Sequence, residues 1–237
     1  MIAHCLFEQS GTFKNEFRKL GIEAYDYDIL IESGQTDHVV DFFAEIKSCF
    51  EGGVSIFDRI KQEDIILAFF PCVRFENQIM LHFRGQMKSI MPWSMEKKIE
   101  YDMKLMDELR DNYHTVCKMF LICMRRGLKL IMENPYSEEH FLRRYWCYPP
   151  AIIDRDRRES GDYYKKPTQY WFVNCKPQGR VLFEPEEWNA IECKDPIRMM
   201  NKDHFGDYAN TMKEARSMIH PSYAKKFIRT QILEEET

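Results

Sequence analysis

The chain has 237 residues, of which 44% are hydrophobic and 30% are charged. This length and balance indicate a folded globular protein with a sizeable core, and they exclude a disordered or fibrous chain. The formal net charge of -4 excludes a uniformly basic coat for nucleic acid, although local basic patches remain allowed.

Neither a membrane span nor a metal site is expected. The longest strongly apolar run, Ile65 to Val73, is too short to cross a bilayer, and the start of the chain lacks the pattern of a signal peptide. The 8 cysteines show no C-x-x-C spacing and no zinc-ligand pattern. We therefore expect a cytoplasmic protein with reduced, mostly buried thiols and no bound metal.

In the N-terminal half, segments typical of strands alternate with segments typical of helices. Continuous apolar or β-branched runs predict strands over 2–7, 22–27 and 65–70, with a minor strand around Val39 and Val40. Helices are predicted over 13–20, ending at Gly21, and over 42–50, ending at Gly52.

The C-terminal half opens with a long predicted helix that ends at Gly127. Apolar residues recur in it at spacings of three and four, which predicts one apolar face; they are Ile99, Met103, Met106, Leu109, Tyr113, Val116, Phe120 and Met124. Further strands are predicted over 128–132 and 169–174, and further helices over 137–144, 209–219 and 223–233.

This alternation predicts an α/β fold with a Rossmann-like, doubly wound, mostly parallel sheet. We expect one α/β domain over 1–175, with an irregular segment and C-terminal helices over 176–237 packed on it. Ligands of such sheets bind at the carboxyl ends of the strands, so the residues that follow each strand are the candidates for a site.

Candidate binding residues follow the first strands. Ser10 and Gly11 lie in a turn before a helix, where backbone N–H groups can hold an anion, although a plain turn has the same composition. Asp28, or Asp26, lies where an acid holds ribose hydroxyls in nucleoside sites, and a solvated loop acid is the alternative. Asp41 follows the minor strand, and the phosphate-binding pattern G-x-G-x-x-G is absent.

Two candidate catalytic residues follow later strands. Pro71-Cys72 comes after the strand over 65–70, and Glu133-Asn134-Pro135 comes after the strand over 128–132. A thiol and an acid at adjacent strand ends would supply a nucleophile and a proton donor to one cleft. The alternatives are a buried thiol and an acid that caps the following helix.

Taken in order, these segments resemble the DNA cytosine-5 methyltransferases, and most closely the short methylase-like proteins of phages and prophages. The resemblance rests on Glu8-Gln9-Ser10-Gly11, Asp26-Tyr27-Asp28, Phe70-Pro71-Cys72, Glu133-Asn134-Pro135, the stretch from Gly161 to Trp171, and Arg216-Ser217. It runs with gaps over about residues 4–232. It implies a methyltransferase-type α/β fold in the cytoplasm of a bacterial or phage-infected cell.

The resemblance implies S-adenosylmethionine as the methyl donor and a cytosine flipped out of DNA as the substrate. Cys72 would add to C6 of the base, and Glu133 would assist at N3. The residues implied for the cofactor are Phe7, Glu8, Ser10, Gly11, Phe13, Asp28, Asp41, Phe42 and Pro71. Those implied for the substrate are Asn134, Lys165, Lys166 and Thr168. The oligomeric state is left open.

Several departures from the family keep other functions open. Phe70 replaces the first proline of the usual Pro-Pro-Cys, and Gln9 replaces a glycine, which allows a catalytically inactive binding or decoy protein. Methylation of an amino group or a free nucleotide ranks last, because its Asp/Asn-Pro-Pro-aromatic motif is missing. Residues 151–180 carry 7 basic and 4 acidic side chains with interleaved aromatics, which predicts a modest DNA-binding patch or a mixed-charge loop.

Overall fold

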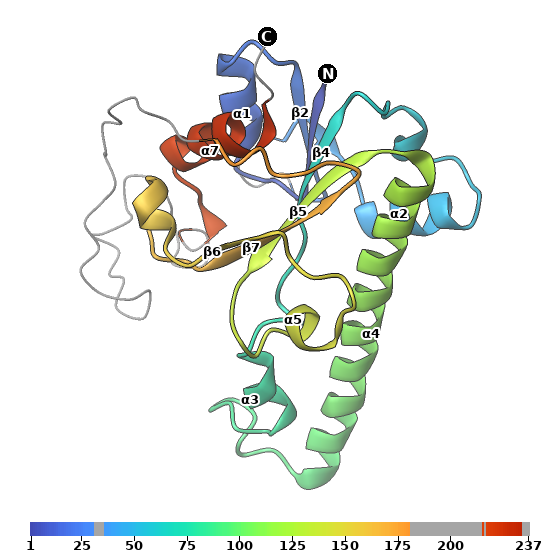
Figure 1. Ribbon diagram of the computed structural model, residues 1–237. Helices are drawn as coiled ribbons and strands as arrows, with labels where there is room; N and C mark the ends of the chain where they lie inside the picture. Colours follow the sequence, from blue (N-terminus) through green and yellow to red (C-terminus); the bar gives the residue numbers. More distant parts are fainter. Residues whose placement is uncertain (31–35, 181–214, 216, 234–237) are drawn as a thin grey trace.

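A computed structural model describes residues 1–30, 36–180, 215 and 217–233 (Figure 1). The described strands form one mixed sheet in the order β3-β2-β1-β4-β5-β7-β6. They are β1 (Ala3–Leu6), β2 (Ala24–Asp28), β3 (His38–Val39), β4 (Ile65–Phe69), β5 (Lys129–Pro135), β6 (Ile152–Asp154) and β7 (Thr168–Val173). The five from β3 to β5 are parallel, and β7 is antiparallel to both β5 and β6.

Helices cover both faces of this sheet. They are α1 (Thr12–Lys19), α2 (Phe42–Phe50), α3 (Ile79–Phe83), α4 (Met95–Arg126), α5 (Phe141–Tyr145) and α7 (Pro221–Phe227), with short helical turns η1 (Ile56–Asp58), η2 (Arg157–Ser160) and η5 (Ile228–Ile232). In Figure 1, α1 and α7 lie together on one face, and α2 packs along α4 on the other. The expected doubly wound α/β architecture is therefore confirmed at this level.

Side chains alternate along the central strands, as the two-residue period of a strand requires. Ile65 and Leu67 of β4 pack into the apolar core under α1 and α7. Ile66 and Ala68 pack into the core under α2 and α4. Because both faces of β4 are covered, its sequence is apolar at every position rather than at every second one.

Local signals explain the helix limits. The Asp41 carboxylate accepts hydrogen bonds from the backbone N–H groups of Phe43 and Ala44 at the start of α2. The Ser94 hydroxyl accepts one from the N–H of Lys97 at the start of α4, and Gly127 ends that helix with φ 70°. Such caps satisfy N–H and C=O groups that lack intrahelical partners, each cap contributing about 1 kcal/mol.

Some predictions from the sequence were wrong. Strand β6 was not foreseen. Strand β5 continues through Pro135, so Glu133 and Asn134 lie within it rather than after it, and α5 is shorter than the helix expected over 137–144. The helix expected over 209–219 lies largely outside the described residues. No described helix has the length and apolar composition that a membrane crossing requires.

Candidate functional site

The strand order reverses between β1 and β4, so the segments that follow these two strands diverge on opposite sides. In open α/β sheets a reversal of this kind creates a crevice at the carboxyl ends of the strands. Of the predicted site residues, Phe7 to Gly11 follow β1, Asp28 ends β2, and Pro71-Cys72 follows β4. Glu133 is the β5 partner of Phe69, so it lies at the same edge of the sheet.

The N-terminus of α1 already has an acceptor from within the chain. The buried carboxylate of Glu8 accepts hydrogen bonds from the backbone N–H groups of Phe13, at 2.7 Å, and Lys14, at 3.3 Å. Ser10 Oγ lies 3.4 Å from the Thr12 nitrogen. From the sequence this turn could hold an anion or be a plain turn, and within the chain Glu8 and Ser10 accept hydrogen bonds from its N–H groups. Burial raises the pKa of Glu8 to about 7.

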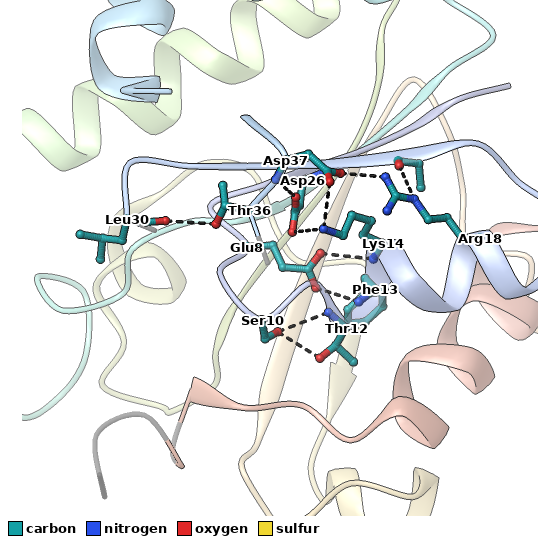
Figure 2. A network of polar contacts seen from close by, with 11 residues as sticks. Glu8, Ser10, Thr12, Phe13, Lys14, Arg18, Asp26, Leu30, Thr36 and Asp37 are labelled. Atoms are coloured by element: carbon teal, nitrogen blue, oxygen red, sulfur yellow. Dashed lines mark hydrogen bonds and ion pairs between the residues drawn. The ribbon is translucent and has the colours of Figure 1, made fainter. Parts of the chain in front are cut away.

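Next to this turn lies an ionic cluster, drawn in Figure 2, in which Lys14 and Asp26 are buried. Lys14 Nζ lies 2.9 Å from Asp26 Oδ2 and 3.4 Å from Asp37 Oδ1. Asp26 Oδ1 accepts a hydrogen bond of 2.6 Å from the N–H of Asp37, and Arg18 contacts Asp37 at 2.8 Å. Asp26 therefore joins β2 to α1 inside the protein, which leaves Asp28 as the acid at the strand end. No local pattern around Lys14 indicates that this side chain is buried.

Asp28 is buried at the end of β2. It accepts a hydrogen bond of 2.8 Å from the N–H of Leu30 and another from the side chain of Gln9. Burial raises the pKa of Asp28 despite these donors. Gln9, the departure from the family glycine, therefore contacts the acid that the resemblance assigns to the ribose.

Aromatic side chains fill the space between the ends of β1 and β4. The Phe7 ring lies 5.3 Å from both Phe42 and Phe70, and Phe70 also packs 5.7 Å from Phe43. Phe70 is thus a core residue where the family has a proline. Phe13, predicted at the cofactor, is fully buried, with its ring 5.0 Å from that of Phe69.

Asn134 ties the ends of β4 and β5 together. Its Nδ2 donates a 2.7 Å hydrogen bond to the Phe70 carbonyl, and its Oδ1 lies 3.0 Å from Nε2 of His140. Burial lowers the pKa of His140 to about 4, so this imidazole is neutral at pH 7 and donates to Asn134. The amide therefore fixes the two strand ends relative to each other, and the predicted contact of Asn134 with substrate stays a prediction.

Cys72 is half-buried, and its thiol donates a 2.9 Å hydrogen bond to Oε1 of Glu76. Burial and the Glu76 carboxylate raise the pKa of the Cys72 thiol well above its ordinary value, while Lys166 acts in the opposite direction. The Glu133 carboxylate acts in the same direction as Glu76. Cys72 follows β4 and Glu133 lies on the neighbouring β5, in register with Phe69, so both belong to the same edge of the sheet.

Glu133 is buried beside an arginine that sequence reasoning did not assign to the site. Arg157 Nη1 lies 3.8 Å from Glu133 Oε1, and Nη2 lies 2.6 Å from Asp162. The Arg157 side chain is fully buried, with its guanidinium 4.4 Å from the Tyr223 ring centre. The Arg157 guanidinium can stay charged inside the protein because two carboxylates and the face of an aromatic ring surround it.

The predicted basic patch over 151–180 is weaker than its composition suggests. Arg157 is buried with Asp162, and Arg158 pairs with Asp156 at 2.5 Å. Lys165 is exposed and Lys166 is half-buried. Thr168 is buried and donates a 3.0 Å hydrogen bond to the Lys166 carbonyl, so it shapes this segment from within.

A separate open cavity of about 400 Å³ lies between α1 and α7, away from the predicted site residues. It is lined by Glu16, Lys19, Leu20, Pro221, Ser222 and Lys225. Among the described residues, no cluster of three or more His, Cys, Asp or Glu side chains has the arrangement of a metal site.

A comparison with models of known protein families gives no match for this chain, and a comparison with curated protein sequences gives none either.

Proposed function

We propose that the chain is an S-adenosylmethionine-dependent methyltransferase that acts on C5 of cytosine in DNA. The observation that carries the proposal is the placement of Cys72 directly after β4 and of Glu133 on the parallel neighbour β5, in register with Phe69. A nucleophile and an acid facing one base are what covalent attack at C6 with assistance at N3 requires. The reversal of strand order beside them supports a nucleoside cofactor at the same edge.

The residues at the ends of β1 and β2 fit a nucleoside that carries a cationic sulfur. Asp28 offers carboxylate oxygens to ribose hydroxyls, and the half-buried rings of Phe7 and Phe43 offer apolar faces that attract a sulfonium. Glu8 would act indirectly, because it holds the turn at α1. S-adenosylmethionine, when bound, supplies an electrophilic methyl group.

Glu76 has a place in this mechanism that the sequence did not predict. As Cys72 Sγ forms a bond to C6 of the base, its proton passes to Glu76 Oε1 along the existing hydrogen bond. The C5–C6 electron pair shifts through C4 toward N3, where the protonated form of Glu133 would supply a proton and would take it back when Sγ leaves. Arg157 keeps the Glu133 side chain in place. After C5 has gained the methyl group, loss of its proton to water expels Sγ and restores the double bond.

Transfer of labelled methyl groups to DNA tests this proposal. Wild-type protein should label cytosine-containing DNA, and Cys72→Ser should not, whereas Cys147→Ser, which changes an exposed thiol, should label like the wild type. An oligonucleotide with 5-fluorocytosine should form a denaturant-resistant adduct with the wild type only. Equal labelling by wild type and Cys72→Ser would exclude the covalent mechanism.

A second candidate function is binding of DNA without methyl transfer. It is favoured by the protonated state of Cys72 and by Phe70, whose ring belongs to the core. In that case wild-type protein forms no adduct and transfers no label, although DNA binding persists. Calorimetry with S-adenosylmethionine then shows whether the cofactor site is retained, with Asp28→Asn as the variant expected to weaken it.

A further inference from the structure

A charged pair ties helix α4 to the segment that carries Cys72. Nε and Nη2 of Arg74 donate hydrogen bonds to Oε2 of Glu108, at 2.6 and 2.5 Å. The two side chains are only 24 and 33% exposed. Two charge-assisted donors on one carboxylate hold a guanidinium in a defined orientation. The pair therefore joins the loop after β4 to a helix that lies far from it in the sequence.

The sequence did not indicate which residues of α4 face the rest of the chain near this pair. Leu105 and Leu109 are buried, and Glu108 lies beside them on the helix surface. Three apolar residues expected on the buried face are exposed, so that prediction was wrong; they are Ile99, Met103 and Met106. In Figure 1 this half of α4 extends past the sheet, with α3 beside it.

Residues 72–76 form a helical turn. The Cys72 carbonyl accepts hydrogen bonds from the backbone N–H groups of Phe75, at 2.8 Å, and Glu76, at 3.1 Å. Residues four apart lie on the same side of such a turn, which is where the Cys72 thiol meets the Glu76 carboxylate. Arg74, two residues from each of them, lies on the other side. It can therefore hold the turn without contacting the thiol.

Phe75 holds the middle of the turn. It is fully buried, its ring lies 6.1 Å from that of Phe70, and its carbonyl accepts a 2.9 Å hydrogen bond from the N–H of Phe141. The pair of Arg74 and Glu108 adds an anchor on the outer side. Rotation of the turn about Phe75 would break this charged contact.

We propose that Arg74 and Glu108 are positioning residues for Cys72. By fixing the turn, the pair keeps the thiol half-buried and facing Glu76. The placement of the thiol is independent of the activity, and only its effect on methyl transfer rests on the proposed function. The competing explanation is that the two residues act on the thiol through their charges alone.

The two explanations differ in the sign of one measurable effect. Alkylation of Cys72 by iodoacetamide can be read by mass spectrometry, with the exposed Cys147 as an internal reference. If charge alone acts, Arg74→Gln should slow alkylation and Glu108→Gln should speed it, because a cation favours the thiolate and a carboxylate disfavours it. If the pair positions the turn, both variants should speed alkylation by about three- to fivefold, the range for loss of a partly exposed ion pair.

An exchange of the two charges tests the pair itself. Arg74→Glu/Glu108→Arg keeps an ion pair at this place and should return the alkylation rate towards that of the wild type. Arg110→Gln breaks an exposed ion pair with Asp107 on the same helix and should alkylate like the wild type. Circular dichroism should be the same for all these proteins. Unchanged rates in the single variants, changes of opposite sign, or no recovery in the exchanged pair would overturn the proposal.

Methyl transfer provides the second measurement. Arg74→Gln and Glu108→Gln should lower kcat and leave KM for DNA nearly unchanged, because the pair acts on the thiol and not on the substrate. A higher KM at constant kcat would place the pair at the DNA-binding surface and overturn its role through Cys72. Wild-type protein that transfers no methyl group, with the alkylation rates as expected, would refute the methyltransferase and leave the positioning of the thiol in place.

Discussion

The guanidinium of Arg157 lies 3.8 Å from the carboxylate of Glu133, and both side chains are buried. One reaches the site from η2, after the edge strand β6, and the other from the central strand β5. Asp162 pairs with the same guanidinium at 2.6 Å. Glu133 on β5 is thus paired with a guanidinium that a second carboxylate, Asp162, also holds.

Replacing Arg157 by Met should destabilise the fold strongly. The change leaves Glu133 and Asp162 buried without their cation, and breaking a buried ion pair costs about 3 to 5 kcal/mol. Urea denaturation should therefore show a lower free energy of unfolding. Arg158→Gln removes an exposed partner of Asp156 and should cost at most about 1 kcal/mol. Similar losses in the two variants would contradict the assigned role of Arg157.

The ion pair between Lys14 and Asp26 should show strong coupling. Lys14→Met leaves Asp26 unpaired inside the protein and should cost about 3 to 5 kcal/mol. Adding Asp26→Asn removes the unpaired charge and keeps an acceptor for the N–H of Asp37. The double variant should therefore lose less free energy of unfolding than the sum of the losses in the two single variants. Additive losses in a double-mutant cycle would show that the pair is not coupled.

Glu76→Gln should make alkylation of Cys72 faster and methyl transfer slower. It removes a negative charge from beside the thiol, which lowers the Cys72 pKa, so alkylation by iodoacetamide at pH 8 should become faster. Under the proposed mechanism, methyl transfer should become slower, because the proton acceptor is lost.

Mass spectrometry reads the alkylation site by site. Cys147, which is exposed, provides an internal reference whose rate should not change. Unchanged alkylation of Cys72 would mean that Glu76 does not control the thiol.

Glu8 should make stability depend on pH. Its pKa is raised from 4.5 to about 7 because the carboxyl is buried. The folded state therefore binds this proton more tightly than the unfolded state does. The resulting stabilisation is complete below about pH 4.5 and is lost as the pH rises through about 7, a change of about 3 kcal/mol.

The free energy of unfolding of wild type relative to Glu8→Gln should fall over this interval. Because Gln keeps an acceptor for the N–H of Phe13, the comparison isolates the titration. A difference that stays constant between pH 4.5 and 7 would exclude Glu8 as the titrating group.

Much of the sheet could be predicted because its local signals agree. Helix α2 was predicted with the limits the structure has, since Asp41 caps its start and glycines follow its end. Strand β4 was recognisable because it is buried on both faces and stopped by Pro71. The placement of Cys72 and Glu133 at one edge of the sheet could be predicted from parallel strand order alone, because neighbouring parallel strands end at the same edge.

Other features depend on tertiary contacts that no local pattern records. Strand β6 has three half-buried residues and is too short for a detectable period. The burial of Arg157 requires Asp162 and Tyr223, the latter from α7, to surround it. The exposure of Ile99 and Met103 was missed because apolar spacing shows that residues share a face but not whether anything covers that face.

The hydrogen bond from Asn134 to the Phe70 carbonyl has a consequence for how the site changes over time. It adds a side-chain tie between the ends of β4 and β5, beyond the main-chain ladder that pairs these strands. Substitutions in the loops and surface helices around this edge leave the tie intact. The placement of Pro71-Cys72 beside β5 can therefore persist while the surrounding surface changes in length and in charge.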